Sequence, residues 1–267
     1  MYDYTVPDRE IKGIVEWAIA RKPKGCIYCN RVALEPSRAP RRPQVTYTSA
    51  SEAAERFLKG FRCDECDLWH ASPWRPLDDP SQDALPVLAG LFHGGELVNV
   101  VTEYGPGRTL PRDAWLTHIR THGTPSGSIG CLFRPNPVTA CPSGNQGGYT
   151  DQDVMAYRFA VLESDILPFD LQLSVLARLP LPVAAITFSG GKSFHALVRV
   201  NAPDAPTYHK GVQHMLALLR PLGFDQQTGN PSRMSRLGGA TRGSKHQRLV
   251  YLHPDVTGNR PILGGAT

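Results

Sequence analysis

Two acidic residues stand two positions apart at the end of an apolar stretch. The apolar residues 159–162 precede Glu163 and Asp165. Because side chains alternate along a strand, both carboxylates are expected to leave the same face, where they can share a divalent cation. Asp225, which follows Gly223 and Phe224, would complete the cluster. The three acids therefore predict a site for Mg²⁺ or Mn²⁺, which prefer oxygen ligands.

A hydroxyl and an imidazole have the same spacing in a second segment. Residues 194–200 place Phe194, Ala196, Val198 and Val200 on one side, which predicts a half-buried strand. Ser193 and His195 would then point the same way. Two glycines before them let backbone amides approach an anion, and Lys192 adds positive charge. This combination suits a triphosphate.

The tripeptide Gly191-Lys192-Ser193 also occurs in the phosphate loop of ATPases, but the rest of that motif is missing. The loop needs a glycine five residues before Gly191, where this chain has Ile186. In addition, Lys192 opens a strand-like segment, whereas the lysine of an ATPase loop opens a helix. The ATPase interpretation is therefore rejected.

Arginines follow the third acid in a segment rich in glycine, proline and serine. Arg233 and Arg236 lie three residues apart there, which predicts that they project from a loop or short turn. Guanidinium groups bind phosphates through paired hydrogen bonds, so the two arginines are candidates for holding a nucleotide or template. Solvated surface charge is the alternative.

Taken together, three motifs resemble those of the archaeo-eukaryotic primase superfamily, in particular its phage and plasmid branch. They are Glu163-Ser-Asp165, Ser189-Gly-Gly-Lys-Ser-Phe-His195 and Asn230-Pro-Ser-Arg-Met-Ser-Arg-Leu237. The resemblance covers about residues 90 to 255. It implies two catalytic Mg²⁺ or Mn²⁺ ions held by Glu163, Asp165 and Asp225, and nucleotide contacts from Lys192, Ser193, His195, Arg233 and Arg236. The chain departs from the family in having Glu163 where many members have Asp, and Gly238-Gly239 where relatives often have a proline.

The resemblance implies a DNA primase or primase-polymerase of a phage, plasmid or other mobile element. Such an enzyme joins NTPs or dNTPs on a single-stranded DNA template. The implied fold is α/β (α+β), an RRM-like catalytic sheet with an extra αβ unit. Because the chain lacks a helicase motor, a separate helicase is an expected partner. A catalytically inactive, zinc-containing DNA-binding accessory protein of replication initiation is the alternative, whereas a rolling-circle nicking enzyme would need a His-x-His motif that is missing.

Two Cys-x-x-Cys pairs near the amino terminus predict a structural zinc site. Cys26 and Cys29 are followed, after 33 residues, by Cys63 and Cys66. Paired thiolates on tight turns suit tetrahedral Zn²⁺, and a redox-active dithiol would need a single pair. A possible capping box at 49–52 and a helix over 53–59 would bring the pairs together. The segment resembles a zinc ribbon, in which His70 is either a supporting residue or a zinc ligand.

Composition and chain order set the remaining expectations. The 267 residues are 41% hydrophobic and carry a net charge of +5, which is compatible with nucleic-acid binding. No apolar run is long enough to span a membrane, so a cytoplasmic protein without a membrane partner is expected. Prolines between Ser72 and Pro86 mark a boundary, which gives a zinc-ribbon module at 1–77, a linker at 78–87 and a catalytic domain at 88–267. Cys131 and Cys141 are expected to be reduced thiols.

Within the catalytic domain, residues 97–101 predict a strand and residues 171–179 a helix. A second helix should begin near Pro206 and bury the stripe of Tyr208, Val212, Met215, Leu216 and Leu219. This helix would lead from the His195 strand to a strand carrying Asp225. The Gly- and Pro-rich segment 105–150 is expected either to line the template groove or to form a long irregular surface loop.

Overall fold

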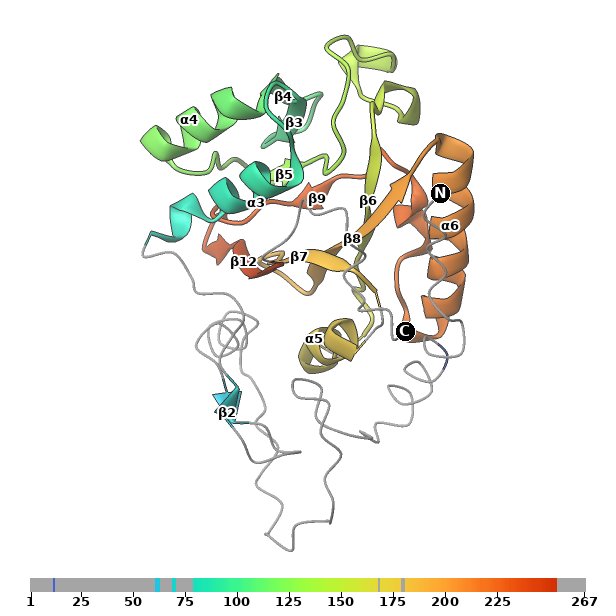
Figure 1. The fold of residues 1–267 in the computed structure, drawn as a ribbon. Coiled ribbons are helices and arrows are strands. Elements are labelled where there is room, and N and C mark those ends of the chain that lie inside the picture. Colours follow the sequence, from blue (N-terminus) through green and yellow to red (C-terminus); the bar gives the residue numbers. More distant parts are fainter. Residues whose placement is uncertain are drawn as a thin grey trace, which may run out of the picture.

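The structure, a computed structural model, describes residue 12 and residues 61–62, 69–70, 79–167, 169–178 and 181–253. The fold is mixed α/β, as predicted. It contains two four-stranded antiparallel sheets, each packed against helices (Figure 1). In addition, β1 (Phe61–Arg62) pairs with β2 (Trp69–His70) on either side of the second cysteine pair. The four predicted zinc ligands and the helix predicted over 53–59 lie outside the described residues.

The first sheet has the strand order β12-β7-β8-β6. Its strands are β6 (Tyr157–Leu162), β7 (Val183–Phe188), β8 (Phe194–Ala202) and β12 (Arg248–Leu252). Helices α5 (Phe169–Arg178) and α6 (Ala205–Leu219) cover one face, where Phe194, Ala196 and Val198 join their core (Figure 1). Leu197 packs on the opposite face. The predicted alternation along β8 is therefore confirmed, and His195 lies on the face away from α5 and α6.

Helix α6 follows the predicted pattern closely. Asp204 caps its first turn by accepting a hydrogen bond from the Thr207 amide at 2.8 Å, and Pro206 lies in that turn, where no amide donor is needed. The five residues of the predicted stripe are its buried residues: Tyr208, Val212, Met215, Leu216 and Leu219. The helix predicted over 171–179 is also confirmed, as α5.

The second sheet has the strand order β4-β3-β5-β9. Its strands are β3 (Leu97–Val101), β4 (Arg108–Pro111), β5 (Leu132–Phe133) and β9 (Ser235–Arg236). Helices α3 (Ala84–Leu91) and α4 (Arg112–His122) share a core with this sheet and with the free face of the first sheet. Strand β3 has the predicted bounds. The two sheets thus meet across one apolar core, and β9 brings the arginine segment to their junction.

The segment 105–150 is more regular than predicted. It contains β4, α4 and β5, and α4 buries Trp115, Leu116 and Ile119. The indole nitrogen of Trp115 also donates a hydrogen bond to the carbonyl of Val98 at 2.9 Å. The expectation of a long irregular loop was wrong because a short amphipathic helix was hidden between glycines and prolines.

The folded unit also begins before the predicted start at residue 88. Helix α3 starts at Ala84, and both Ala84 and Val87 are buried in the core. Pro86 lies in the first turn of α3, where a missing amide donor is tolerated. The prolines of this segment therefore mark a helix start as well as a boundary.

Polar side chains tie the end of the described chain to distant segments. Asp83 is buried, and its Oδ2 accepts hydrogen bonds from the Leu249 amide at 3.0 Å and Arg248 Nε at 3.1 Å. Burial raises the pKa of this carboxyl group. The side chain of Gln247 pairs with both backbone groups of Cys131, at 2.7 and 3.2 Å. The last strand is thereby bound to α3 and to the second sheet.

Short elements complete the described fold. They are the strands β10 (Thr241–Arg242) and β11 (Lys245–His246) and the 3₁₀ turns η1 (Pro80–Gln82), η2 (Asn145–Gly147), η3 (Asp151–Asp153), η4 (Arg220–Leu222) and η5 (Gln226–Gly229). Cys131 is buried and Cys141 exposed, and both are free thiols, as predicted. Among the described helices, none has the length and apolarity needed to cross a bilayer.

Candidate functional site

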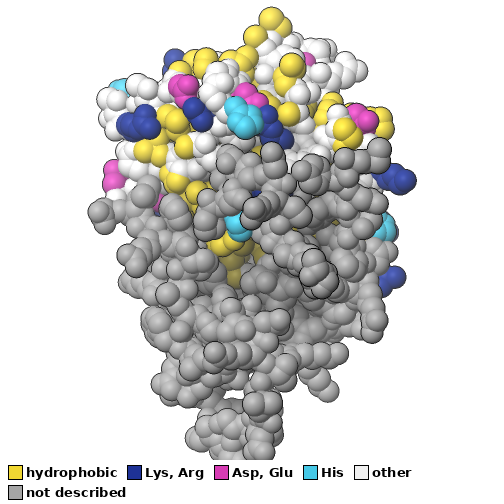
Figure 2. All heavy atoms as spheres, in the orientation of Figure 1, with side chains coloured by type: hydrophobic (Ala, Val, Ile, Leu, Met, Phe, Trp, Pro, Cys, Tyr) yellow, Lys and Arg dark blue, Asp and Glu magenta, His cyan; other side chains and the backbone are white. Residues whose placement is uncertain are grey.

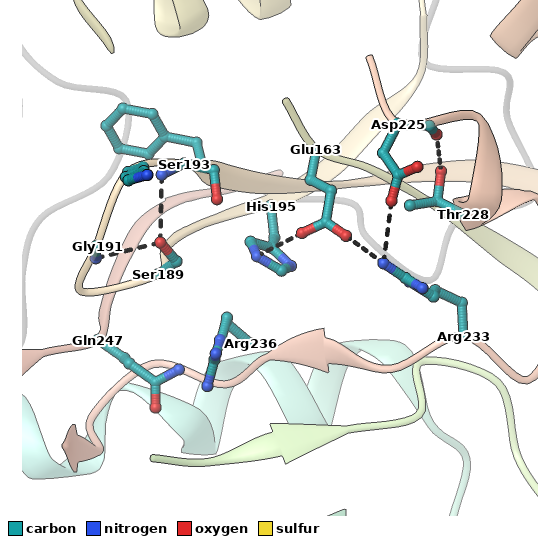
Figure 3. A network of polar contacts seen from close by, with 12 residues as sticks. Glu163, Ser189, Gly191, Ser193, His195, Asp225, Thr228, Arg233, Arg236 and Gln247 are labelled. Carbon is teal, nitrogen blue, oxygen red and sulfur yellow. Dashed lines mark hydrogen bonds and ion pairs between the residues drawn. The ribbon is translucent and has the colours of Figure 1, made fainter. Parts of the chain in front are cut away.

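Glu163 and His195 meet where strand β6 of the first sheet ends beside β8. The antiparallel register pairs Leu162 with Ala196. Glu163, which follows Leu162, therefore lies opposite His195, which precedes Ala196. His195 Nε2 lies 2.9 Å from Glu163 Oε2, and the two side chains are 7% and 15% exposed (Figure 3). Because an ionised carboxylate only accepts hydrogen bonds, Nε2 carries the hydrogen. The predicted acid and imidazole therefore form a direct, largely buried pair.

Asp225 reaches the same place from a turn. Its backbone amide donates to the carbonyl of Glu163 at 2.9 Å, which fixes the two residues side by side. Its Oδ1 accepts a hydrogen bond from the Gln227 amide at 2.9 Å and so caps η5. The expectation of a strand at Asp225 was wrong because Gly223, in a left-handed conformation, ends η4 and turns the chain directly into this cap.

Arg233 joins the two carboxylates. Its Nη2 atom lies 2.6 Å from Glu163 Oε1 and 3.2 Å from Asp225 Oδ2 (Figure 3). Burial raises the pKa of Glu163, but the hydrogen bonds and charges of His195 and Arg233 outweigh it and lower this pKa to about 2. Glu163 is therefore ionised at any ordinary pH, and the pair of acids already holds a cationic group.

Asp165 is not brought into this network. Strand β6 ends at Leu162, and Ser164 starts a turn in which its Oγ donates to the Gly223 carbonyl at 2.8 Å and accepts from the Leu167 amide at 3.0 Å. Asp165 lies exposed in that turn. Within the described ranges, no three His, Cys, Asp or Glu side chains are grouped closely enough to hold a metal ion. The structure thus collects two of the three predicted acids.

The loop before β8 is stabilised by hydrogen bonds between its own residues. Ser189 Oγ accepts hydrogen bonds from the amides of Gly191 at 3.2 Å and Ser193 at 3.3 Å (Figure 3). The Gly191 amide was expected to face an anion, and in this structure it faces Ser189 instead. Ser193 is buried and Lys192 is exposed. The loop therefore presents Lys192 to solvent on a compact turn.

Gln172 on α5 anchors this loop, and no sequence pattern singled it out. Its Nε2 donates to the carbonyls of Leu167 at 2.9 Å and Lys192 at 3.0 Å, and its Oε1 accepts from the Phe194 amide at 2.9 Å. The side chain is buried. A polar residue on the inner face of an otherwise amphipathic helix was the available signal.

Arg236 approaches from the second sheet. It lies on β9, below His195 in the view of Figure 3, and its Nη1 donates to the carbonyl of Ile129. Burial and the neighbouring Arg242 lower its pKa, although a guanidinium remains charged. In the described part of the chain, Arg236 forms no salt bridge with a carboxylate. It is thus a half-buried cation beside the acid pair.

The turn that carries Arg233 is fixed by residues far away in the sequence. Asp151 Oδ1 accepts hydrogen bonds from Ser232 Oγ at 2.6 Å and from the Ser232 amide at 3.2 Å. Asn136 Nδ2 donates to the carbonyls of Pro231 and Phe159, each at 2.9 Å. Asp151 and Asn136 were missed because their partners lie 81 and 95 residues away, beyond the reach of any local pattern.

One buried atom of the site lacks a partner. His195 Nδ1 has no hydrogen-bond partner among the described residues, although the side chain is 7% exposed. Buried polar atoms are nearly always paired in folded proteins. This ring nitrogen is therefore a hydrogen-bonding group of the site that the described protein leaves unused.

The described surface gives a weaker indication of binding. In the face shown in Figure 2, basic, acidic and apolar side chains are interspersed. The net charge of +5 is therefore not gathered into one basic patch on the described part of this face. The arrangement of charges inside the site is the more informative feature.

Comparisons with known proteins give one structural similarity. No protein-family model matches the chain, and no curated protein matches it. Among solved structures, the chain is similar to the AEP domain of the primase-polymerase of cyanophage S-2L, with 20% sequence identity and a TM-score of 0.45. The similarity covers 64% of this chain and 89% of that chain.

Proposed function

We propose that this protein is a primase-polymerase, which joins nucleotides on a single-stranded DNA template. The observation that carries the proposal is the junction of the two sheets, where paired carboxylates, a buried imidazole and two guanidinium groups converge. The first sheet contributes Glu163 and His195, and the cap of η5 contributes Asp225. The segment that leads into the second sheet contributes Arg233 and Arg236. Acids beside phosphate-binding cations are what nucleotidyl transfer requires.

The two paired acids suit a divalent cation. Mg²⁺ is commonly held by one or two carboxylates, with water and substrate phosphates completing its shell. Glu163 and Asp225 supply such carboxylates, and the contact of both with Arg233 Nη2 supports the proposal that a cation can lie between them. Asp165 stays a proposed third ligand. Bound Mg²⁺ or Mn²⁺ would activate the primer 3′-hydroxyl and stabilise charge on the departing pyrophosphate.

The remaining groups would orient the triphosphate. The Arg236 guanidinium can donate hydrogen bonds to phosphate oxygens, and His195 Nδ1 can do so when the ring is protonated on both nitrogens. Lys192, exposed on its turn, and Ser193 would add contacts at the other end of the site. Rate acceleration would come from positioning and charge, so no covalent enzyme intermediate is expected.

The amino-terminal cysteines belong to the same proposal. Cys26, Cys29, Cys63 and Cys66 would hold one structural Zn²⁺ in a module that assists template binding or initiation. A separate helicase would supply single-stranded template.

A primer-synthesis assay tests the proposed function. The full chain is incubated with single-stranded DNA, labelled NTPs or dNTPs, and Mg²⁺ or Mn²⁺, with and without a primer. Incorporation that depends on template and metal is the expected result. Binding of DNA and nucleotide without incorporation under every condition would instead favour the inactive accessory protein.

A further inference from the structure

We propose that Arg233 is the resident counter-ion of the acid pair and that a divalent cation must displace it to bind. The displaced guanidinium would then turn to the phosphates of the incoming nucleotide. This inference rests on the proposed function and adds a competition between one side chain and the metal. It makes Arg233 a residue that couples metal binding to nucleotide binding.

The occupancy of the carboxylate oxygens is the first argument. Glu163 Oε1 faces Arg233 at 2.6 Å and Oε2 faces His195 at 2.9 Å. Asp225 Oδ2 faces Arg233 at 3.2 Å, and Oδ1 accepts from the Gln227 amide at 2.9 Å. Every oxygen of the pair thus already has a donor. A cation that enters between the acids must replace at least one of them, and Nη2 of Arg233 occupies the position shared by both.

Charge is the second argument. Two carboxylates with one guanidinium between them form a compact, partly buried cluster in which opposite charges are close. A divalent cation placed beside the same oxygens would repel the guanidinium at short range. Arg233 and the metal therefore compete for one place.

The attachment of Arg233 allows this exchange. Its backbone amide donates to the Asn230 carbonyl at 3.1 Å, and the preceding Ser232 is bound to Asp151. The turn is thus fixed, while the Arg233 side chain is 33% exposed at the mouth of the pair. The guanidinium can move by side-chain rotation with the backbone in place. A triphosphate offers it new oxygen partners, so nucleotide binding would free the acids for the metal.

Binding of Mn²⁺ alone to the full chain, followed by electron paramagnetic resonance or calorimetry, tests the competition. Arg233→Gln removes the competing charge, and we expect it to bind Mn²⁺ about tenfold more tightly than the parent, or more, since a charged hydrogen bond no longer has to be broken. Arg242→Gln is the matched control. It removes the same charge from β10, where the described chain shows no ion pair with either acid, and should change the affinity less than about twofold.

Thermal unfolding and a second variant distinguish a loss of competition from a loss of folding. Thermal unfolding of each variant is recorded first, and Arg233→Lys, which retains the charge, should bind Mn²⁺ nearly as the parent does. If folded Arg233→Gln binds Mn²⁺ no more tightly than Arg242→Gln, or more weakly than the parent, Arg233 does not compete and the inference fails. The proposed function survives that result if the parent still makes primers.

A double variant distinguishes failure of this inference from failure of the proposed metal site. Glu163→Gln with Asp225→Asn should lower Mn²⁺ binding to background in both the parent and the Arg233→Gln protein. If the parent and Arg233→Gln both equal this background, the acid pair is not a metal site. The metal chemistry of the proposed function then fails together with the competition.

Discussion

The sheet that carries β6 and β8 and the sheet that carries β9 present differently paired side chains to the candidate site. On the first, Glu163 is bound to His195 and Arg233, and Asp225 to Arg233 and a backbone amide. On the second, Arg236 contacts a backbone carbonyl and forms no salt bridge within the described residues. The carboxylates of the first group have all their donors without a ligand, whereas the guanidinium of the second has unused capacity for an anion.

This difference separates two kinds of contribution. Removal of one partner from a charged pair in the free protein destabilises the fold, and such paired groups must rearrange to bind a ligand. A cation that lacks a carboxylate partner contributes mainly to ligand affinity, when a phosphate binds to it. Substitutions on the acid side should therefore affect chemistry and stability, and substitutions on β9 mainly affinity.

The largest effect is expected from Asp225→Asn. The change preserves shape but removes a charge from the proposed metal site, so primer synthesis should fall to background while DNA binding persists. Asp204→Asn is the control, because asparagine caps the start of α6 as well as aspartate does. Normal synthesis by the Asp225 variant would contradict the role of the acid pair.

Asp165→Asn sharpens the same comparison. We expect loss of incorporation, as for Asp225, if metal binding recruits this third acid. Because Asp165 is exposed in its turn, the melting temperature should stay within about 1 °C of the parent value. An active Asp165 variant would restrict the metal site to Glu163 and Asp225.

Arg236→Gln should act on affinity. Loss of a charged hydrogen bond to phosphate costs about 1.5 to 3 kcal/mol, which corresponds to about 10- to 150-fold weaker nucleotide binding. Arg120→Gln, which removes an exposed arginine from the last turn of α4, should leave binding unchanged. Equal affinities of the two variants in equilibrium titrations would make Arg236 a structural residue.

The acid side should also give a pH signature. The pKa of Glu163 is lowered in the folded protein, so its contribution to stability is fully present above its unfolded pKa of about 4.5 and is lost as pH falls towards 2. Glu163→Gln should lower the free energy of unfolding by about 2 to 3 kcal/mol at pH 7. Denaturant unfolding at several pH values should show this difference shrinking below about pH 4.5. A constant difference would mean that packing, and not charge, carries the effect.

The smallest effect is expected from Ser232→Ala. The change removes the hydroxyl that donates to Asp151 and should cost about 1 kcal/mol of stability. In an Asp151→Ala background the same substitution should cost less, because its partner is gone. Additive losses in denaturant unfolding would show that the two residues act independently.

Local patterns predicted the elements of the fold better than the assembly of the site. The bounds of β3, the stripe of α6 and the alternation along β8 follow directly from hydrophobic periodicity. The pairing of Glu163 with His195 depends on strand register, which periodicity does not specify. Gln172 and Asp151 escaped notice because a single polar residue reveals its role only through a partner from another part of the chain.

Asp165 illustrates the opposite error. A two-residue spacing predicts a common face only while the strand continues, and here Ser164 ends it with a side-chain hydrogen-bonded turn. Helix α4 was missed because its few apolar residues are flanked by strong turn formers. The first error extends a correct periodicity beyond the end of a strand, and the second overlooks a periodicity confined to a short segment.

The attachment of the last strand has a consequence for synthesis on the ribosome. The hydrogen-bond partner of Asp83 is Leu249, which is synthesised 166 residues later. The partner of the Cys131 backbone is Gln247, which is synthesised 116 residues later. Contacts of such separation close late, because a growing chain must expose both ends before they can meet. The apolar faces of α3 and β3 therefore emerge long before β12 can cover them. We expect nascent chains that end before residue 245 to bind chaperones and resist compaction, and the acid pair to form only after the arginine turn and this final strand have left the exit tunnel.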